Sequence, residues 1–159
     1  MKKAGIKNLY FEDRNMITNH ESDFHPLLIK AERFCAYQER CSHEVKQKMK
    51  ELGADEKKTE KIISSLEADD FLNEERFAKL FTSGKFRIKK WGKNKIRAAL
   101  KMKRISDNII ESALEDLDEL EYLKTIKHLV EKKRKEIKNP ELRIQNQKIG
   151  MFLLSRGFE

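Results

Sequence analysis

Two stretches of the sequence share one pattern of apolar residues at a constant offset of 51 residues. Within residues 42–66 and 93–117 the matching pairs are Val45 and Ile96, Met49 and Leu100, Ala54 and Ile105, Ile63 and Leu114, and Leu66 and Leu117. Each stretch has the spacing of an amphipathic helix, a tight break and a second helix. A weaker third match places Ile149, Leu153 and Gly157 at an offset of 104 from Val45, Met49 and Gly53. Such a repeat predicts small helical units stacked in a row, suited to gripping a long partner, rather than one enzyme fold around a deep pocket.

The composition agrees with an all-α fold that has a thin core and a charged surface. Charged residues make up 39% of the 159 residues, and there are only two prolines and six glycines. The net charge of +8 favours an acidic partner such as nucleic acid. The start Met-Lys-Lys lacks a following apolar stretch, and no apolar run is long enough for a membrane span, so we expect a cytoplasmic protein.

The pattern divides the chain into an arm and three repeats, which predict an elongated tandem array of helix-turn-helix-like units. Residues 1–22 show no sustained period and predict a flexible arm. Residues 23–72, 73–118 and 119–159 form repeats one, two and three. A third helix of repeat three is expected after Glu159, so this repeat is predicted to be truncated and to lack its last helix.

Polar residues before the apolar stretches mark where helices begin. The expected starts are Asp23 or Pro26, Ser42, Asp55, Asn73 and Ser106, with a stop and restart at Asn139-Pro140. We expect Phe77, Ala78, Leu80 and Phe81 to point inward. Cys35 lies on an apolar helical stripe and is expected in the core, whereas Cys41, at a helix junction, is expected to be more exposed. With no second pair, both are expected to be reduced thiols.

The charge is concentrated in one segment of repeat two. It has ten basic residues and no acidic one: Lys85, Arg87, Lys89, Lys90, Lys93, Lys95, Arg97, Lys101, Lys103 and Arg104. The following residues 105–121 hold seven acids and no base. So many like charges repel one another, which favours a binding role over a merely solvated face. Such a segment neutralises phosphates in a salt-dependent and largely sequence-independent way.

Trp91 lies in the middle of this basic segment and has two interpretations. It could stack on an unpaired base, or it could wedge between two helices at the turn. We favour packing, because tryptophan gains much from burial. The cluster Lys132–Lys135 is more typical of a solvated helix face.

No motif in the sequence predicts an enzyme, a metal site or a cofactor. His20, His25, His43 and His128 lack ligand spacing. Ser83-Gly84-Lys85 resembles a phosphate loop, but Lys79 replaces its first glycine and Phe86 its magnesium-binding hydroxyl residue.

Several blocks resemble the bacterial RecX regulatory proteins. The run Asp70-Phe71-Leu72-Asn73-Glu74-Glu75-Arg76-Phe77-Ala78 resembles that family's "leucine, two acids, x, Arg-Phe-Ala" signature, with Asn73 in the first acidic position. Residues 40–53 resemble that family's first repeat, residues 91–100 resemble its second, and residues 152–158 resemble the start of its third. The resemblance covers roughly residues 27–159. We expect Arg76, Phe77 and Ala78 to be mainly structural.

The resemblance implies an all-α regulator that binds the RecA recombinase filament on single-stranded DNA. It implies inhibition of recombinase, ATPase and coprotease activities, and therefore a role in DNA repair, recombination and the SOS response. We expect a monomer whose basic segment and Trp91 contact RecA or, weakly and through phosphates, the DNA. The alternative is a stand-alone helix-turn-helix-like transcriptional regulator with residues 93–103 as its recognition helix. A helix with mainly Lys would read base edges poorly.

Overall fold

The computed structural model describes residues 23–138 and 141–159, which form α-helices without a strand. The expected arm of residues 1–22 and the expected break at Asn139-Pro140 lie outside the described residues. The chain divides into two compact units, residues 1–73 and residues 74–159. No helix in the described ranges has the length and apolar character that a membrane span requires.

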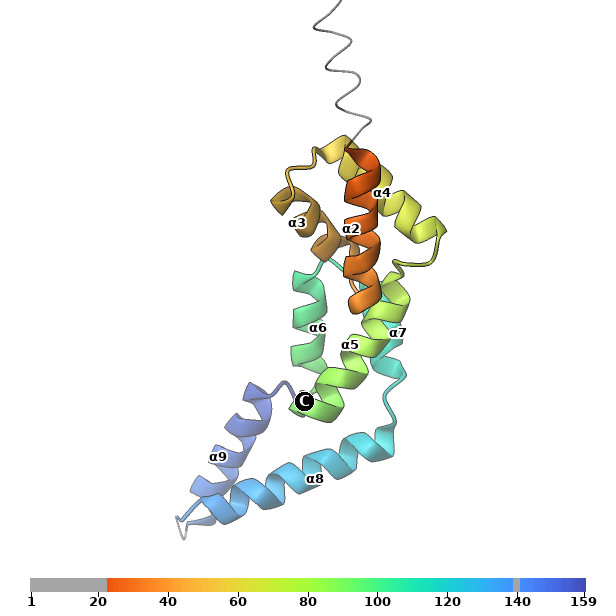
Figure 1. The fold of residues 1–159 in the computed structure, drawn as a ribbon. Coiled ribbons are helices and arrows are strands. Elements are labelled where there is room, and N and C mark those ends of the chain that lie inside the picture. Colours follow the sequence, from red (N-terminus) through yellow and green to blue (C-terminus); the bar gives the residue numbers. More distant parts are fainter. Residues whose placement is uncertain (1–22, 139–140) are drawn as a thin grey trace, which may run out of the picture. The chain divides into compact units, whose positions relative to one another are not determined.

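The first unit contains three helices that contact one another in every pairing (Figure 1). They are α2 (Phe24–Tyr37), α3 (Ser42–Glu51) and α4 (Glu56–Ala68). The N-cap of α4 is Asp55, as expected, and its Oδ1 accepts a hydrogen bond of 2.8 Å from the Lys58 N–H. The core consists of Leu27, Ala31, Cys35, Val45, Met49, Ile62, Ile63, Leu66 and Leu72.

The second unit begins with three more mutually packed helices. They are α5 (Glu74–Lys89), α6 (Lys93–Met102) and α7 (Asp107–Glu115). Their buried residues include Phe77, Ala78, Phe86, Ile96, Leu100, Ile105, Ile110, Ala113 and Leu114. The expectation that Phe77 points inward is therefore confirmed, and Leu100 and Leu114, two apolar residues of the repeat pattern, are core residues as well.

Two further helices complete this unit, α8 (Glu119–Glu136) and α9 (Leu142–Ser155). The N-cap of α8 is Asp118, whose Oδ1 accepts a hydrogen bond of 2.6 Å from the Glu121 N–H. The two helices pack on each other, and α9 runs back toward the loop between α5 and α6 (Figure 1). The end of the described chain therefore lies against the start of α6.

The repeat is visible in the backbone as well as in the apolar pattern. Gly53, Arg104 and Gly157 occupy equivalent positions after α3, α6 and α9, and their φ angles are 78°, 61° and 86°. The next N–H bonds back to a carbonyl oxygen five residues earlier in each case: Ala54 to Met49 at 3.0 Å, Ile105 to Leu100 at 3.2 Å, and Phe158 to Leu153 at 3.1 Å. This is the Schellman helix end, which requires a left-handed residue. The chain thus contains the same helix ending three times.

Three local expectations were wrong. Leu80 is 56% exposed because the buried Ala78, Thr82 and Phe86 are spaced by four residues, which places Leu80 on the other side of α5. Cys41 is fully buried, because it serves as the N-cap of α3 inside the first unit. Ser42 is the first residue of α3 rather than its cap. Cys35 is buried as expected, and burial raises the pKa of its thiol to about 11.

The contrast between Leu100 and Leu80 gives a test of the second unit's core. Leu100 is fully buried on α6, so Leu100→Ala should lower the free energy of unfolding by about 2–5 kcal/mol. Leu80→Ala makes the same chemical change at a position that is 56% exposed and should cost less than about 0.5 kcal/mol. Urea denaturation followed by circular dichroism measures both. Equal losses would contradict the placement of these two side chains.

Candidate nucleic-acid interface

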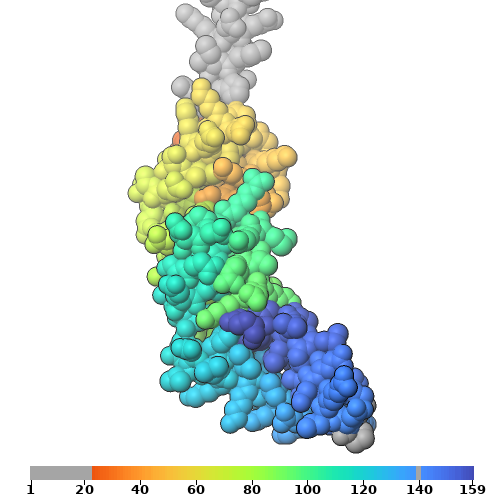
Figure 2. All heavy atoms as spheres, turned by 180° about the vertical axis from the view of Figure 1, so that it is seen from behind, coloured from red at the N-terminus to blue at the C-terminus, as the bar shows by residue number. Residues whose placement is uncertain are grey.

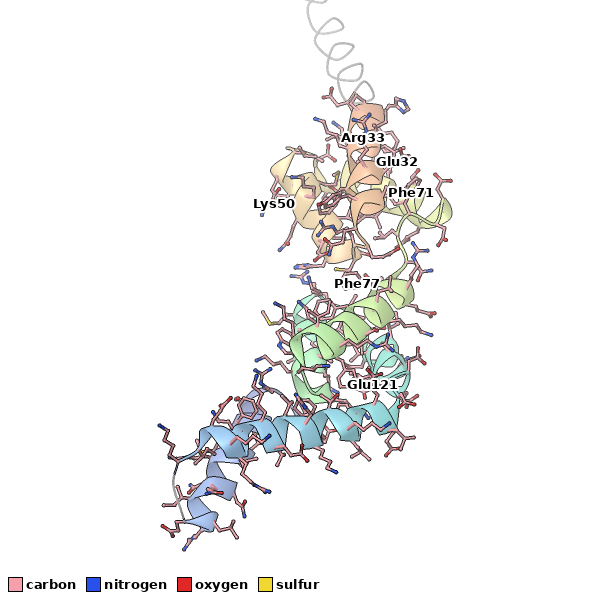
Figure 3. The ribbon with its side chains drawn as sticks, turned by 60° about the horizontal axis from the view of Figure 1, so that its bottom comes forward. Glu32, Arg33, Lys50, Phe71, Phe77 and Glu121 are labelled. Carbon is pink, nitrogen blue, oxygen red and sulfur yellow. The ribbon has the colours of Figure 1, made fainter. Side chains whose placement is uncertain are left out.

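Part of the basic segment is paired with the acidic segment that follows it. Arg87 Nη2 lies 3.5 Å from Glu121 Oε2, and Arg97 Nε lies 2.7 Å from Glu111 Oε1. Lys101 Nζ lies 3.0 Å from Asp107 Oδ1. Glu121 marks the first turn of α8 in Figure 3. The reversal of charge along the sequence therefore becomes a set of ion pairs between neighbouring elements of the second unit.

Arg97 is the most firmly held of these bases. Its Nε donates to Glu111 Oε1 at 2.7 Å, and its Nη2 donates to Glu111 Oε2 at 3.0 Å. Its Nη1 donates to Asn94 Oδ1 at 2.8 Å. The hydrogen bond between the two side chains raises the pKa of Arg97 and lowers that of Glu111. A bidentate pair of this kind fixes the orientation of the guanidinium group as well as neutralising its charge, so Arg97 links α6 to α7.

Other bases of the segment lie against aromatic rings instead of acids. Lys95 Nζ and Lys85 Nζ lie 5.0 Å and 5.1 Å from the centre of the Trp91 ring. Lys85 Nζ also lies 5.0 Å from the Phe81 ring, and Lys103 Nζ lies 5.7 Å from the rings of Phe81 and Phe77. These contacts form a continuous row of alternating cations and rings. We name it the basic–aromatic strip: Lys95, Trp91, Lys85, Phe81, Lys103 and Phe77.

Helix geometry explains why these residues meet. Phe77, Phe81 and Lys85 follow one another at intervals of four residues on α5 and therefore share one face. The helix ends through Lys90, whose φ is 52°, and the Trp91 N–H bonds to the Lys85 carbonyl oxygen at 3.3 Å. This ending brings the indole next to Lys85. Lys95 comes from α6, and Lys103 is the residue that ends α6.

The strip has the chemistry to hold a polyanion that carries flat rings. Within residues 23–138 and 141–159, no carboxylate pairs with Lys85 or Lys95, although Lys95 Nζ donates to the Ser155 carbonyl oxygen at 3.2 Å. An exposed contact between a lysine and a ring is worth about 0.5–1 kcal/mol. Stacking of a nucleobase on an aromatic side chain is worth about 1–3 kcal/mol. A strand could therefore displace the lysines from the partly exposed rings of Trp91 and Phe81 while its phosphates bind the ammonium groups.

The remaining predicted residues lie around the strip or beneath it. Lys93 Nζ lies 5.1 Å from the Tyr122 ring and Lys90 Nζ lies 6.0 Å from the Phe86 ring. Lys89 and Arg104 are exposed. In the expected family signature, Phe77 and Ala78 are buried and Arg76 is half-buried. Figure 3 marks Phe77 on α5.

Two glycines let the end of α9 touch the start of α6. A Cβ atom on Gly92 would collide with the backbone of Gly157 and Phe158, and one on Gly157 would collide with Lys95. The Gly92 N–H donates to the Arg156 carbonyl oxygen at 2.8 Å, and the Asn94 N–H donates to that of Gly157 at 3.0 Å. Figure 2 shows these darkest-blue terminal residues against the green surface. We call this contact the glycine junction.

Tyr122 of α8 reinforces the glycine junction from inside. Its hydroxyl oxygen accepts a hydrogen bond of 3.1 Å from the Lys93 N–H, and its hydroxyl donates to Glu159 Oε2 at 3.0 Å. Its ring lies between those of Phe86 and Phe158, with centre distances of 5.6 Å and 5.3 Å. Burial raises the pKa of this phenol to about 12. The first N–H groups of α6 are thus satisfied by α8 and by the chain after α9.

The same three-helix organisation occurs in a known protein family. The chain matches the model of the second three-helix domain of RecX over residues 73–114 and that of the third three-helix domain over residues 119–159. Chlorobaculum tepidum regulatory protein RecX is 32% identical to it over 117 residues, which cover 73% of this chain and 70% of that protein. The chain belongs to the RecX family.

Two further comparisons agree with this membership of the RecX family. Clostridium tetani regulatory protein RecX is 36% identical over 118 residues, which cover 72% of this chain and 53% of that protein. The crystal structure of RecX from Lactobacillus salivarius matches with a TM-score of 0.81 at 27% identity, over 87% of this chain and 90% of that one. The chain spans about half the length of the first curated RecX relatives that it matches.

Sequence reasoning found the basic segment of this RecX family member but missed the glycine junction. Tyr122 looked like one of several apolar residues of its helix, and Gly157 like a plain helix end. Neither pattern reveals a contact between the ends of two helices. The one available signal was that Gly92 and Gly157 each border an aromatic residue, Trp91 and Phe158.

Gly92→Ala tests whether the glycine junction holds the second unit together. The new methyl group has no space against the backbone of Gly157 and Phe158, so we expect a loss of about 1–3 kcal/mol in the free energy of unfolding. Gly84→Ala is the matched control, because nothing lies within 4 Å of that position inside α5. It should stabilise the helix by up to about 1 kcal/mol. Thermal unfolding measures the stability of both variants. An equal change in the two variants would contradict the stabilising role of the glycine junction.

The raised pKa of the Tyr122 phenol predicts that the fold loses stability at alkaline pH. In the unfolded chain it ionises near pH 10.0, whereas in the fold its pKa is about 12, so the folded state keeps a proton that the unfolded state has lost. The free energy of unfolding should therefore fall by up to about 1.4 kcal/mol per unit above pH ~10. Tyr122→Phe should remove this component, and Tyr37→Phe, at an 86% exposed ring, should not. Urea titrations at several alkaline pH values measure it, and an unchanged slope in Tyr122→Phe would count against the assignment.

Proposed function

We propose that this chain is a regulatory protein that binds the RecA recombinase filament on single-stranded DNA. It inhibits the filament's recombinase, ATPase and coprotease activities, and so modulates DNA repair, recombination and the SOS response. It acts in the cytoplasm as a monomer. Membership of the RecX family and the name of its relatives, regulatory protein RecX, support the regulatory part of this proposal.

The basic–aromatic strip is the observation that carries the filament-binding part. Arg87, Arg97 and Lys101 are engaged by acids of the same unit. Lys85 and Lys95 instead contact rings and a carbonyl oxygen, which leave their charge uncompensated. Uncompensated lysines on a half-exposed surface favour a polyanionic partner such as the DNA of the filament.

Inhibition by binding needs no catalytic group. A protein made of repeated helical units can contact several filament protomers at once, and each further contact forms at a high effective concentration. Protomers held together in this way cannot complete their cycle of ATP hydrolysis or leave the filament. The proposed mechanism is therefore locking of neighbouring protomers.

The alternative is a stand-alone helix-turn-helix-like DNA-binding protein that inserts α6 into a major groove. Recognition helices contact bases through their N-terminal residues. In the second unit, the backbone N–H groups at the start of α6 are taken up by the glycine junction and by Tyr122, while the side chains of Asn94 and Lys95 stay exposed. The side chains that α6 presents are mainly lysines, which read base edges poorly, and this favours the filament regulator over the alternative.

The decisive experiment is a titration of the protein into RecA from the same organism during single-stranded-DNA-dependent ATP hydrolysis. We expect inhibition well below one protein per RecA protomer, because one regulator locks more than one protomer. No effect at excess protein, with helical content shown by circular dichroism, would exclude this function. Selective binding of one duplex sequence without RecA would instead support the alternative.

A pair of charge reversals tests the role of the strip. Lys85→Glu with Lys95→Glu should raise the protein concentration needed for half inhibition and reduce its dependence on salt, by about 0.7 in the log–log slope for each lost phosphate contact. Lys132→Glu with Lys135→Glu on α8 is the control, because it makes the same change in charge at two exposed lysines outside the strip. Equal effects of the two pairs would mean that only net charge matters.

A further inference from the structure

Trp91 is the single tryptophan of the chain, and its surroundings are unusual for a packing residue. It follows the end of α5 and is half-buried. The ammonium groups of Lys85 and Lys95 both lie within cation–ring contact of it, at 5.1 Å and 5.0 Å from the ring centre. The ring is thus bordered by two positive charges and is only partly buried.

The buried aromatic stack of the second unit does not include Trp91. Phe86, Tyr122 and Phe158 stack on one another at 5.6 Å and 5.3 Å, and each of the three is at least 95% buried. Trp91 is outside this stack and is held by its own backbone N–H on the Lys85 carbonyl oxygen. The sequence favoured packing for this residue, and the geometry moves the balance toward an exposed function.

We infer that Trp91 is a base-stacking residue for single-stranded nucleic acid, with Lys85 and Lys95 on the phosphates that flank the stacked nucleotide. A strand supplies both complements at once, since every nucleotide carries a flat base and a charged phosphate. The face of a base is available to a side chain in an unpaired strand and is hidden in a duplex. Carboxylates of an acidic protein partner would satisfy the two lysines but would not themselves stack on the ring.

This inference deepens the proposed function and rests on it for the source of the strand. On a filament, the subsite would hold DNA directly, so that the regulator contacts the strand as well as the recombinase. Phe81 of α5 and Lys103 at the end of α6 continue the row: the Phe81 ring lies 5.0 Å from Lys85 Nζ and 5.7 Å from Lys103 Nζ. They provide a second ring and a further cation for the neighbouring nucleotide.

The chain's single tryptophan allows a direct test with the unaltered protein. Intrinsic fluorescence is followed during titration with an oligothymidylate of about 15 nucleotides, the upper range for a small single-strand module. The comparison strand is abasic and has the same length and charge. We expect saturable quenching by the thymidylate and little by the abasic strand. Equal binding of both strands by anisotropy, without quenching, would overturn the inference and leave a phosphate site only.

Variants then separate stacking from folding. Trp91→Ala should weaken thymidylate binding about 5- to 140-fold, the range for one stacked base, whereas Trp91→Phe, which keeps a flat ring, should weaken it much less. Equal losses in both variants would indicate a structural role instead. Uridylate and duplex strands of the same length complete the test: uridylate should quench as well, and quenching by the duplex as strong as by the single strand would contradict the subsite.

The outcome is independent of the test with RecA. Inhibition of ATP hydrolysis without any quenching by thymidylate would remove the stacking subsite and leave the regulatory function. Quenching without an effect on RecA would leave the subsite and remove the regulatory function.

Discussion

A side chain at position 92 would occupy the space of the Gly157 and Phe158 backbone, and much of the second unit depends on that close approach. It lets the carbonyl oxygens of Arg156 and Gly157 accept the N–H groups of Gly92 and Asn94. Two helix ends therefore satisfy each other, since α6 has exposed donors at its start and α9 has exposed acceptors at its end. The Arg156 guanidinium adds a hydrogen bond of 3.0 Å to the Lys89 carbonyl oxygen at the end of α5. Three helices thus meet at one point without a buried charge.

The basic residues of the second unit fall into two groups, those paired with carboxylates and those that are not. Bases that face α7 or α8 meet carboxylates, and exposed pairs of this kind each contribute about 0–1 kcal/mol. They add little stability, but they remove repulsion within the basic segment and leave the charge of Lys85 and Lys95 on one surface. The acidic segment therefore shapes the site, because it decides which of the bases keep an uncompensated charge.

The repeat pattern predicted the helices and the buried residues well, because both depend on local periodicity. Val45 and Ile96, and Met49 and Leu100, are buried at equivalent positions as their pairing implies. For the candidate site, the sequence predicted which segment of the chain carries it but not the contacts of its side chains. That Arg97 would pair with Glu111 while Lys95 would lie against Trp91 depends on helix packing, which a count of charges does not contain. The prediction that Leu80 points inward was wrong for a related reason. Its helix has one buried face, and an apolar residue close to that face in the sequence need not lie on it.

Lys95 connects the fold to the proposed site. Its backbone and Cβ atom occupy the space that a side chain at position 157 would need. Its Nζ donates to the Ser155 carbonyl oxygen and lies 5.0 Å from the centre of the Trp91 ring. Trp91 in turn directly precedes Gly92 in the glycine junction. The docking of α9 therefore determines where Lys95 and the Trp91 ring stand in the proposed site before any strand arrives. A site whose residues are already in place loses less conformational entropy on binding, so in the proposed site the contact between the two glycine backbones would support affinity as well as folding.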